Sequence, residues 1–385
     1  MKSTLKHVLE QIHHRSLWQI LVAYAVGGWA VIGGSGTLMD VLGLPDWVPP
    51  AVTVILVAAL PLVLATAYIQ KRGIGGPELV TGAPEQGLRR WFSWRNLALA
   101  VGAGFVLLSS GTAGYMGMRV MGIGPLGTLQ ARGLIPDTAR ILVADLDGPE
   151  VDSLTVAAVT EAVFAGLAQS SVIRVVYREE LDGVLETMRA SPAVPMTDSM
   201  AREVAVRAGI PVVVTGSLNP VGEAYSLSVR LVEPDSNKVL LIHRESAESE
   251  EGLITAGGAV DRLTGHIRER IGESLRSLRE REPLPSVTTS SLEALKLFAR
   301  ARGLSGDEKR AALEAAVELD PDFGMAWRSL ASSYGQNSEK GIMAFERAFQ
   351  VADRLSEQER LYVMGTYYLV SDIDYEKSAE VNRRL

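Results

Sequence analysis

The sequence has no cysteine, no Walker-type phosphate loop and no cluster of histidines. Without cysteine the chain forms neither a disulfide bond nor a thiolate nucleophile, although this does not fix its compartment. No glycine is followed by lysine, as a phosphate loop requires. The five histidines are scattered, without the spacing of a metal site. We therefore expect a protein that is not an enzyme and has no catalytic residue, metal or cofactor.

Charge is also missing from three long apolar stretches, at about 16–39, 47–70 and 96–118. A helix rises about 1.5 Å per residue and the hydrocarbon core of a bilayer is roughly 30 Å thick, so each stretch is long enough to cross it. The sequence predicts a membrane domain at 1–121 with three transmembrane helices.

Positive charge lies on one side of these spans. The turn between the first two spans, "DVLGLPDWVPP", has two aspartates and no basic residue. The amino terminus and the second loop carry the basic residues Lys2, Lys6, Arg15, Lys71, Arg72, Arg89, Arg90 and Arg95. Because basic loops stay in the cytoplasm, everything after the third span is predicted to lie outside it, in the periplasm of a bacterium. The protein would then be a multi-pass protein of the inner membrane.

The part after the membrane domain lacks an excess of positive charge. Residues 1–121 hold 9 Lys/Arg against 5 Asp/Glu, and the remainder holds 29 against 40. Phosphate binding needs clustered cations, so this acidic balance argues against nucleic acid as a partner.

Gly122, Gly124 and Gly127 in "GIGPLG" have the spacing G-x-G-x-x-G of a nucleotide loop. Such a loop leaves a strand and enters a helix, whereas this one follows a membrane span. The kinase-like triplets "APE" (83–85), "HRE" (243–245) and "DFG" (322–324) stand in the wrong order for a kinase. We interpret residues 122–138 as a Gly/Pro linker at the exit from the membrane.

Residues 139–280 alternate between strand and helix patterns. Apolar branched runs at 140–146, 172–177 and 210–218 are typical of strands, and 224–233 with 238–246 is typical of a hairpin. Between them lie helical patterns, of which 197–209 opens with the cap candidates Thr197 and Asp198 and closes on Gly209. A long amphipathic helix is expected from Ala259 to Leu278. The pattern predicts one α/β domain.

Asp145 and Asp147 follow the first strand, as in haloacid dehalogenase-like phosphatases, and Thr215 resembles the second motif of that family. Pro149 replaces the usual small residue, and no acidic pair follows Thr215 to complete a magnesium site. We interpret Asp145 and Asp147 as strand-end turn and helix-cap residues, and such a phosphatase remains an alternative.

After a linker at 281–291, residues 292–385 are predicted to be all helical and repetitive. The spacing of large and small residues is close to that of tetratricopeptide repeats, with the last repeat incomplete. The residues expected to pack the helices together are Trp327, Leu330, Tyr334, Phe345 and Ala348. The residues expected to face a protein or peptide partner, on the inner helix face, are Arg328, Ser332 and Gln336.

The stretches "RILVADLDG", "AREVAVRAGIPVVVTGSL" and "YSLSVRLVEPDSNKVLLIHRESA" together resemble the TolB amino-terminal/FlgO-like α/β domain of bacterial envelope proteins. With the membrane spans and the repeats, the chain resembles the non-kinase half of bacterial transmembrane serine/threonine kinase-like signalling proteins. The resemblance implies a membrane-anchored scaffold or sensor that binds proteins, among them a kinase or an envelope assembly component. The sensory portion of a split or truncated kinase is the alternative.

Overall fold

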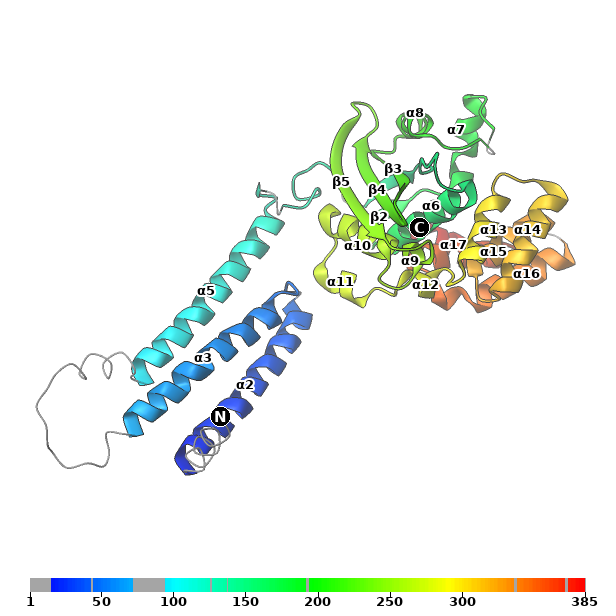
Figure 1. Cartoon of the computed structure of the whole chain (residues 1–385). Coiled ribbons are helices and arrows are strands. Elements are labelled where there is room, and N and C mark those ends of the chain that lie inside the picture. Colours follow the sequence, from blue (N-terminus) through cyan, green and yellow to red (C-terminus); the bar gives the residue numbers. More distant parts are fainter. Residues whose placement is uncertain are drawn as a thin grey trace, which may run out of the picture. The chain divides into compact units, whose positions relative to one another are not determined.

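A computed structural model describes residues 15–42, 44–71, 94–124, 127–136, 138–191, 194–335, 338–370 and 373–384. The chain forms two compact units, Met1–Leu126 and Gly127–Leu385 (Figure 1). Lys2, Lys6, most of the second loop (72–93, with the "APE" triplet) and Gln336 lie outside the described residues.

The first unit contains three long helices, α2 (Arg15–Leu42), α3 (Val48–Lys71) and α5 (Trp94–Val120). Their segments 20–37, 48–67 and 98–120 are long and apolar enough to cross a membrane. These windows are 0%, 22% and 6% buried within the protein, so their apolar surface is left uncovered by other parts of the chain. Exposed apolar surface on this scale fits contact with lipid, and the predicted set of three apolar helices is confirmed.

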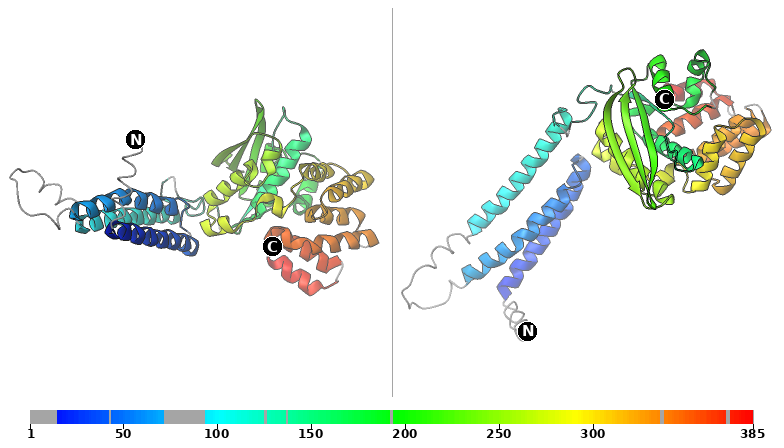
Figure 2. Two further views of the ribbon diagram at one scale, coloured as in Figure 1. Left: turned by 60° about the horizontal axis from the view of Figure 1, so that its bottom comes forward. Right: turned by 45° about the horizontal axis from the view of Figure 1, so that its top comes forward.

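The second unit is built on a five-stranded sheet in the order β2-β1-β3-β4-β5. The sheet is mixed. Strand β1 is parallel to both β2 and β3, whereas β3, β4 and β5 form an antiparallel meander (Figure 2). The strands are β1 (Ala139–Val143), β2 (Ile173–Val175), β3 (Val212–Val221), β4 (Ala224–Glu233) and β5 (Lys238–Ala247). The predicted α/β organisation and its hairpin are present, with β1 and β2 shorter than expected.

Alternating side chains of β1 point into two separate cores. Ile141 and Val143 pack on the side of α6 (Ser153–Ala168) and α10 (Ala259–Ile271). Leu142 and Ala144 pack on the other side, with α7 (Asp182–Thr187) and α8 (Asp198–Ala208). The period-two alternation of a strand therefore gives the parallel part of the sheet helices on both faces.

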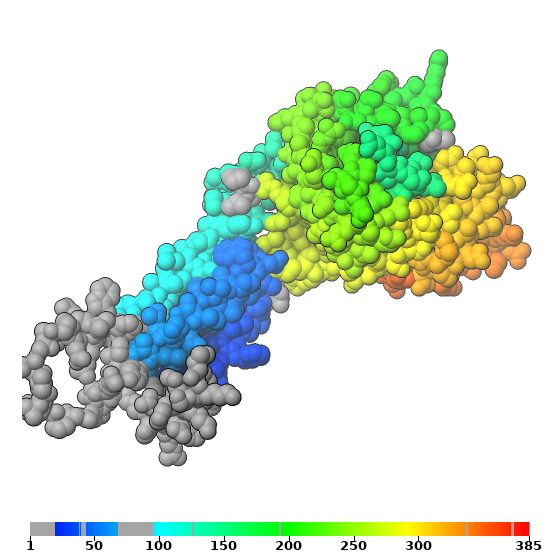
Figure 3. Space-filling model, in the orientation of Figure 1, coloured from blue at the N-terminus to red at the C-terminus, as the bar shows by residue number. Residues whose placement is uncertain are grey.

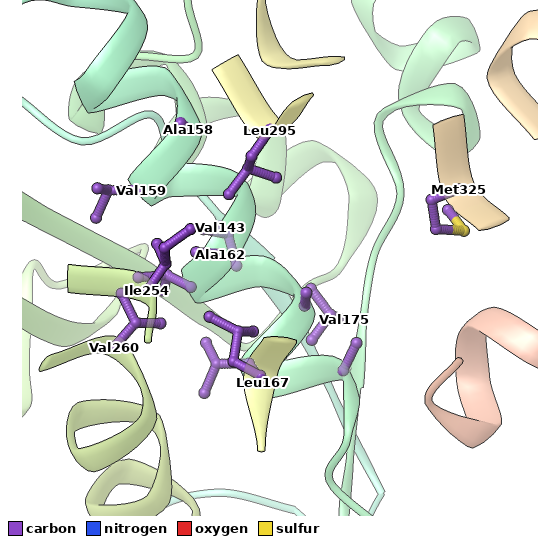
Figure 4. Close-up of a cluster of buried hydrophobic side chains, with 14 of the residues drawn as sticks. Val143, Ala158, Val159, Ala162, Leu167, Val175, Ile254, Val260, Leu295 and Met325 are labelled. Atoms are coloured by element: carbon purple, nitrogen blue, oxygen red, sulfur yellow. The ribbon is translucent and has the colours of Figure 1, made fainter. Parts of the chain in front are cut away.

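Helix α6 is buried nearly all round, since 12 of its 16 residues are buried. It packs against α10 and β2 and against α13, which comes from the helical tail. Figure 4 shows Val143, Val260 and Leu295 converging on its residues Ala158, Val159, Ala162 and Leu167. Its sequence, "SLTVAAVTEAVFAGLA", has almost no polar face, which is typical of a helix covered on every side.

The tail consists of three consecutive helix pairs, in which the two helices of a pair pack on each other and α14 and α16 pack on the pair that follows. The pairs are α13 (Leu292–Ala301) with α14 (Gly306–Leu319), α15 (Gly324–Tyr334) with α16 (Glu339–Gln350), and α17 (Glu357–Val370) with α18 (Tyr375–Arg384). Leu330, Phe345 and Ala348 are buried between helices, and Trp327 and Tyr334 are partly buried there.

The two segments expected to be linkers differ from free linkers where the structure describes them. In 127–136, Leu129 and Ile135 are buried, and the Leu129 N–H donates to the Arg270 carbonyl over 2.9 Å. In 281–291, the Leu284 N–H donates to the buried Asp261 carboxylate over 3.0 Å. The tail and the sheet consequently belong to one unit, and the yellow helices of the tail lie directly against the green surface (Figure 3).

The helix expected over 259–278 is interrupted. It ends at Gly272, whose φ is 147°, and α11 (Leu275–Glu280) follows. A Cβ at Gly272 would lie 2.3 Å from the Gln130 Oε1 atom, so glycine lets residue 130 pack closely here.

Arg268 and Glu273, on the two sides of this break, form an ion pair that is 1% and 0% exposed. Two guanidinium nitrogens donate to the carboxylate over 2.7 and 2.8 Å, and the hydroxyls of Ser170 and Ser277 donate to it as well. Burial raises the pKa of Glu273, but the hydrogen bonds from Arg268 hold it below its ordinary value.

Glu273→Gln should destabilise the second unit by about 3–5 kcal/mol, because it leaves the Arg268 charge buried and unpaired. The measurement is urea unfolding of the full chain in detergent micelles, followed by circular dichroism. The exposed Glu280→Gln is the matched control and should change stability by less than about 0.5 kcal/mol. Equal effects from both variants would contradict a structural role for the pair.

Candidate functional site

Helix α15 presents two faces, and the structure gives them roles different from those expected. Trp327, Leu330 and Tyr334 follow a helical spacing that turns them toward the helices α14 and α16. Arg328 lies on the other face, toward the sheet. The residues expected to be only scaffold therefore border an open groove, whereas a residue expected to meet a partner meets the chain itself.

The outer groove, about 600 Å³ in volume, lies between α14, α15 and α16. Its apolar lining consists of Val317, Trp327, Leu330, Met343 and Ala344, with Tyr334 at its end. The Met343 side chain is 62% exposed, although it is large and apolar. An apolar groove on a helical scaffold is a common docking surface for the apolar face of a partner helix.

The two rims of the outer groove carry opposite charge. Glu314 and Glu318 line it from α14, and Lys340 and Arg347 line it from α16. The Lys340 ammonium lies 5.4 Å from the centre of the Tyr334 ring. A partner would therefore find acidic groups along one rim and basic groups along the other.

Hydrogen bonds hold the walls of the outer groove in place. The Trp327 Nε1–H donates to the Pro321 carbonyl over 2.8 Å, and the Tyr334 hydroxyl donates to Glu314. Arg347 pairs with Asp322 over 3.1 Å. Side chains that are fixed before binding lose less conformational entropy when a partner arrives.

Arg328 is buried on the opposite face of α15. Its guanidinium carbon lies 3.8 Å from the centre of the Tyr362 ring, and Nη1 lies 3.8 Å from the Glu179 carboxylate. Ser332 is exposed, as a partner-facing residue should be, and Gln336 is outside the described residues. The predicted inner face is thus covered, at Arg328, by Tyr362 of α17 and by Glu179 of the α/β part of the same chain.

Contacts from α13 and α17 fasten this covered face to the sheet. The Gln358 side chain pairs with both the N–H and the carbonyl of Val175 on the outermost strand β2, as a neighbouring strand would. Tyr362 stacks on Tyr177 with ring centres 4.3 Å apart. On α13, Lys296 pairs with Glu250 over 3.0 Å.

An inner cavity of about 290 Å³ lies within this interface. It is bounded by α6 and the segment after β2 on one side, and by α13, α15 and the start of α17 on the other. Its wall combines aromatic rings with charged groups: Phe164, Tyr177, Phe298, Phe323, Glu161, Arg178, Glu179, Asp182, Arg302, Lys309, Arg328 and Glu359.

Burial shifts the pKa of several of these groups. It raises the pKa of Glu359 to about 7, against the hydrogen bonds from Ser356 that favour the carboxylate. It lowers the pKa of Arg302 to about 10, an effect that Asp145 opposes. Arg302 also forms an ion pair with Glu161, which is 6% exposed. Sequence reasoning missed this site, although Glu161 inside an otherwise apolar helix was a visible sign of it.

Asp145 and Asp147 have different surroundings. The Asp145 carboxylate pairs with Arg178 and accepts the Met196 N–H over 2.7 Å, whereas the Asp147 side chain is exposed. Both were expected to be strand-end turn and helix-cap residues. Neither caps α6, because Asp152 accepts the first N–H groups of that helix. Among the described residues no group of three or more His, Asp or Glu could hold a metal ion.

Residues of the kinase-like triplets "DFG" and "HRE" take part in packing. Asp322 and Phe323 of the "DFG" triplet precede α15, and Phe323 is buried. His243 of "HRE" lies on β5 and stacks on His266 of α10, with ring centres 3.9 Å apart. Burial, together with the charge of His243, lowers the pKa of His266.

The raised pKa of Glu359 makes stability depend on pH. Because the folded state holds this proton up to about pH 7 while the unfolded state releases it near 4.5, stability falls as pH rises through this window. Glu359→Gln should remove that fall and stabilise the chain at pH 8 by up to roughly 3 kcal/mol. Urea unfolding at pH 5, 6, 7 and 8 tests this, with the exposed Glu346→Gln as control. A wild-type pH dependence retained by Glu359→Gln would contradict the assignment.

Comparisons with known proteins show no family for this chain. No protein-family model and no curated protein matches it. The LpoB C-terminal domains from Escherichia coli and Salmonella enterica are 18% and 19% identical, and both have TM-scores of 0.27. They cover 29% and 31% of this chain and 84% and 90% of their own. Lipoprotein GNA1162 from Neisseria meningitidis is 16% identical with a TM-score of 0.22, over 28% of this chain and 78% of its own. Likeness at this level supports no conclusion about function.

Proposed function

We propose that this chain is a membrane-anchored, protein-binding scaffold or sensor of the bacterial cell envelope. The observation that carries the proposal is the outer groove, where the exposed Met343 lies beside the partly buried Trp327 and Tyr334 on helices whose other face is already covered. The three apolar helices α2, α3 and α5 supply the anchor. Tetratricopeptide-like pairing of the helices fits the same role, since such repeats present surfaces to partners.

The partner proposed for the outer groove is an amphipathic helix of another protein. Its apolar stripe would contact Trp327, Tyr334 and Met343. Basic residues on one side of that stripe would face Glu314 and Glu318, and acidic residues on the other side would face the α16 rim.

Met343→Glu should weaken partner binding at least about tenfold, because it places a charge where the apolar stripe of the partner would lie. A photo-crosslinking amino acid at position 343 in membranes should give a discrete adduct whose partner peptide is identified by mass spectrometry. Val206, which is also an exposed apolar residue but lies on α8, is the matched control for both changes.

Adducts of equal yield at positions 206 and 343 would argue against the groove as the binding surface. A partner peptide that is not an amphipathic helix would also do so. If the peptide comes from a serine/threonine kinase, the chain acts as the sensory portion of a split kinase.

The charge of the short flanks supports a periplasmic position of the second unit. Because the sequence has no cysteine, single introduced cysteines report topology without background. Ser332→Cys should react with a membrane-impermeant maleimide in cells whose outer membrane is permeabilised, and Gln86→Cys in the second loop should react only after lysis. The reverse pattern would place the second unit in the cytoplasm and overturn the proposed orientation.

A further inference from the structure

The first two turns of α17 lie against the outermost strand of the sheet. The Gln358 side chain bonds to both backbone groups of Val175 on β2. One turn later the Tyr362 ring stacks on the Tyr177 ring, with centres 4.3 Å apart. Glu359 stands between these two contacts in the sequence, is 3% exposed and lies at the wall of the inner cavity. An ionisable side chain is thus buried in the middle of this contact, which we call the α17 latch.

The surroundings of Glu359 favour its neutral form. Its carboxylate accepts hydrogen bonds from the hydroxyl and the N–H of Ser356 over 2.7 and 3.3 Å. Burial outweighs these hydrogen bonds and raises the pKa of Glu359 to about 7. The closed latch therefore holds a proton at pH values where a glutamate in water is already charged.

The ionisable groups around Glu359 do not hold it in the charged form. Arg328 of α15 lines the same cavity, but its guanidinium lies over the Tyr362 ring and pairs with Glu179. Burial raises the pKa of Tyr177 and of Tyr362, so both rings stay neutral near pH 7. The other charged groups of the cavity wall are Glu161, Arg178, Asp182, Arg302 and Lys309. Burial and the Ser356 hydrogen bonds, rather than any of these charges, set the pKa of Glu359.

Opening of the latch is linked to the proton on Glu359. In the open state this side chain reaches water, and its pKa returns to the ordinary value of 4.5. The closed state then binds the proton more tightly, so the stability that protonation gives to closure is complete below pH 4.5 and is lost as pH rises to about 7. The two pKa values change the opening equilibrium by up to roughly 300-fold, and a rise in pH favours opening.

Contacts that do not involve Glu359 hold the start of the helical tail in place. Leu292, Ala294 and Leu295 of α13 are buried in the core that also contains α6. Because apolar contacts do not titrate, α13 stays docked on α6 when the latch opens. The movement is therefore confined to the end of the tail, at α17 and α18.

We propose that the α17 latch is a pH-sensitive closure, which holds the last helix pair against β2 while Glu359 is protonated and releases it when Glu359 ionises. Release uncovers the backbone groups of Val175 at the free edge of β2. It also uncovers the Arg328 guanidinium, over which Tyr362 lies in the closed state. The outer groove is formed by α14, α15 and α16, so the latch does not depend on the protein partner proposed there.

The test measures amide hydrogen exchange of the full chain in detergent micelles at pH 5 and pH 8, corrected for the intrinsic dependence of exchange on pH. The Val175 N–H donates to Gln358 over 3.2 Å and reports directly on the latch. Protection in peptides covering 171–177 and 356–364 should fall at least about tenfold at pH 8, since local opening governs exchange there. Protection in α13 should not change.

Glu359→Gln keeps the size of the side chain and removes its titration. In this variant the latch should stay closed at both pH values, with equal protection in the two peptides. Glu346→Gln, at an exposed residue of α16, is the matched control and should behave as the wild type. Asp182→Asn changes another acidic residue of the cavity wall and should also leave the pH dependence as it is.

Three results would overturn the proposal. The wild type may show equal protection at both pH values, Glu359→Gln may keep the fall in protection, or α13 may lose protection together with α17, which is unfolding of the whole unit. Met343→Glu should retain the pH dependence of the latch, so a failure of the groove as a partner site is distinguishable from a failure of the latch.

Discussion

Helix α6 has to be covered on every side, and the arrangement of the second unit follows from that requirement. Its apolar residues run round the whole helix, so packing it on the sheet alone would leave part of its apolar surface facing water. Helix α10 covers part of it, and Gly166 allows the two helices to come close, since a Cβ there would meet the Thr264 side chain at 2.8 Å. Helix α13 covers much of the rest.

Because α13 is joined to the following helix pairs, this docking also fixes α15 and α17 against the sheet. Gln358 then occupies the free edge of β2, which would otherwise offer unpaired backbone groups to another strand. At Arg328, the inner face of the helix pairs is therefore covered by other parts of the same chain. The outer groove, with Met343 exposed, remains open on the same helices.

Local patterns in the sequence predict much of this fold. Thr197 caps α8 and Gly209 ends it with φ 64°, as expected, and the β4–β5 hairpin lies where the turn residues place it. The predictions that differ from the structure concern long-range packing. Residues 281–291 have the composition of a linker, but Leu284 is buried and bonded to Asp261. Arg328 has the spacing of a surface residue, but Tyr362 lies over it. The spacing of apolar residues in the sequence does not indicate either contact, whereas it does indicate the apolar surface of α6.

The scaffold and sensor roles proposed for this chain would involve the same helix. Helix α15 lines the outer groove with Trp327 and Leu330 and the inner cavity with Arg328, one residue away. A ligand that binds Arg328 changes the free energy of partner binding in the groove only if α15 has two positions and the ligand binds one of them more tightly. The stacked rings of Tyr177 and Tyr362 and the Gln358 pairing resist such a movement, since they tie α17 to β2. Any coupling between the two surfaces must therefore act through the contact of the helix pairs with the sheet rather than through α15 alone.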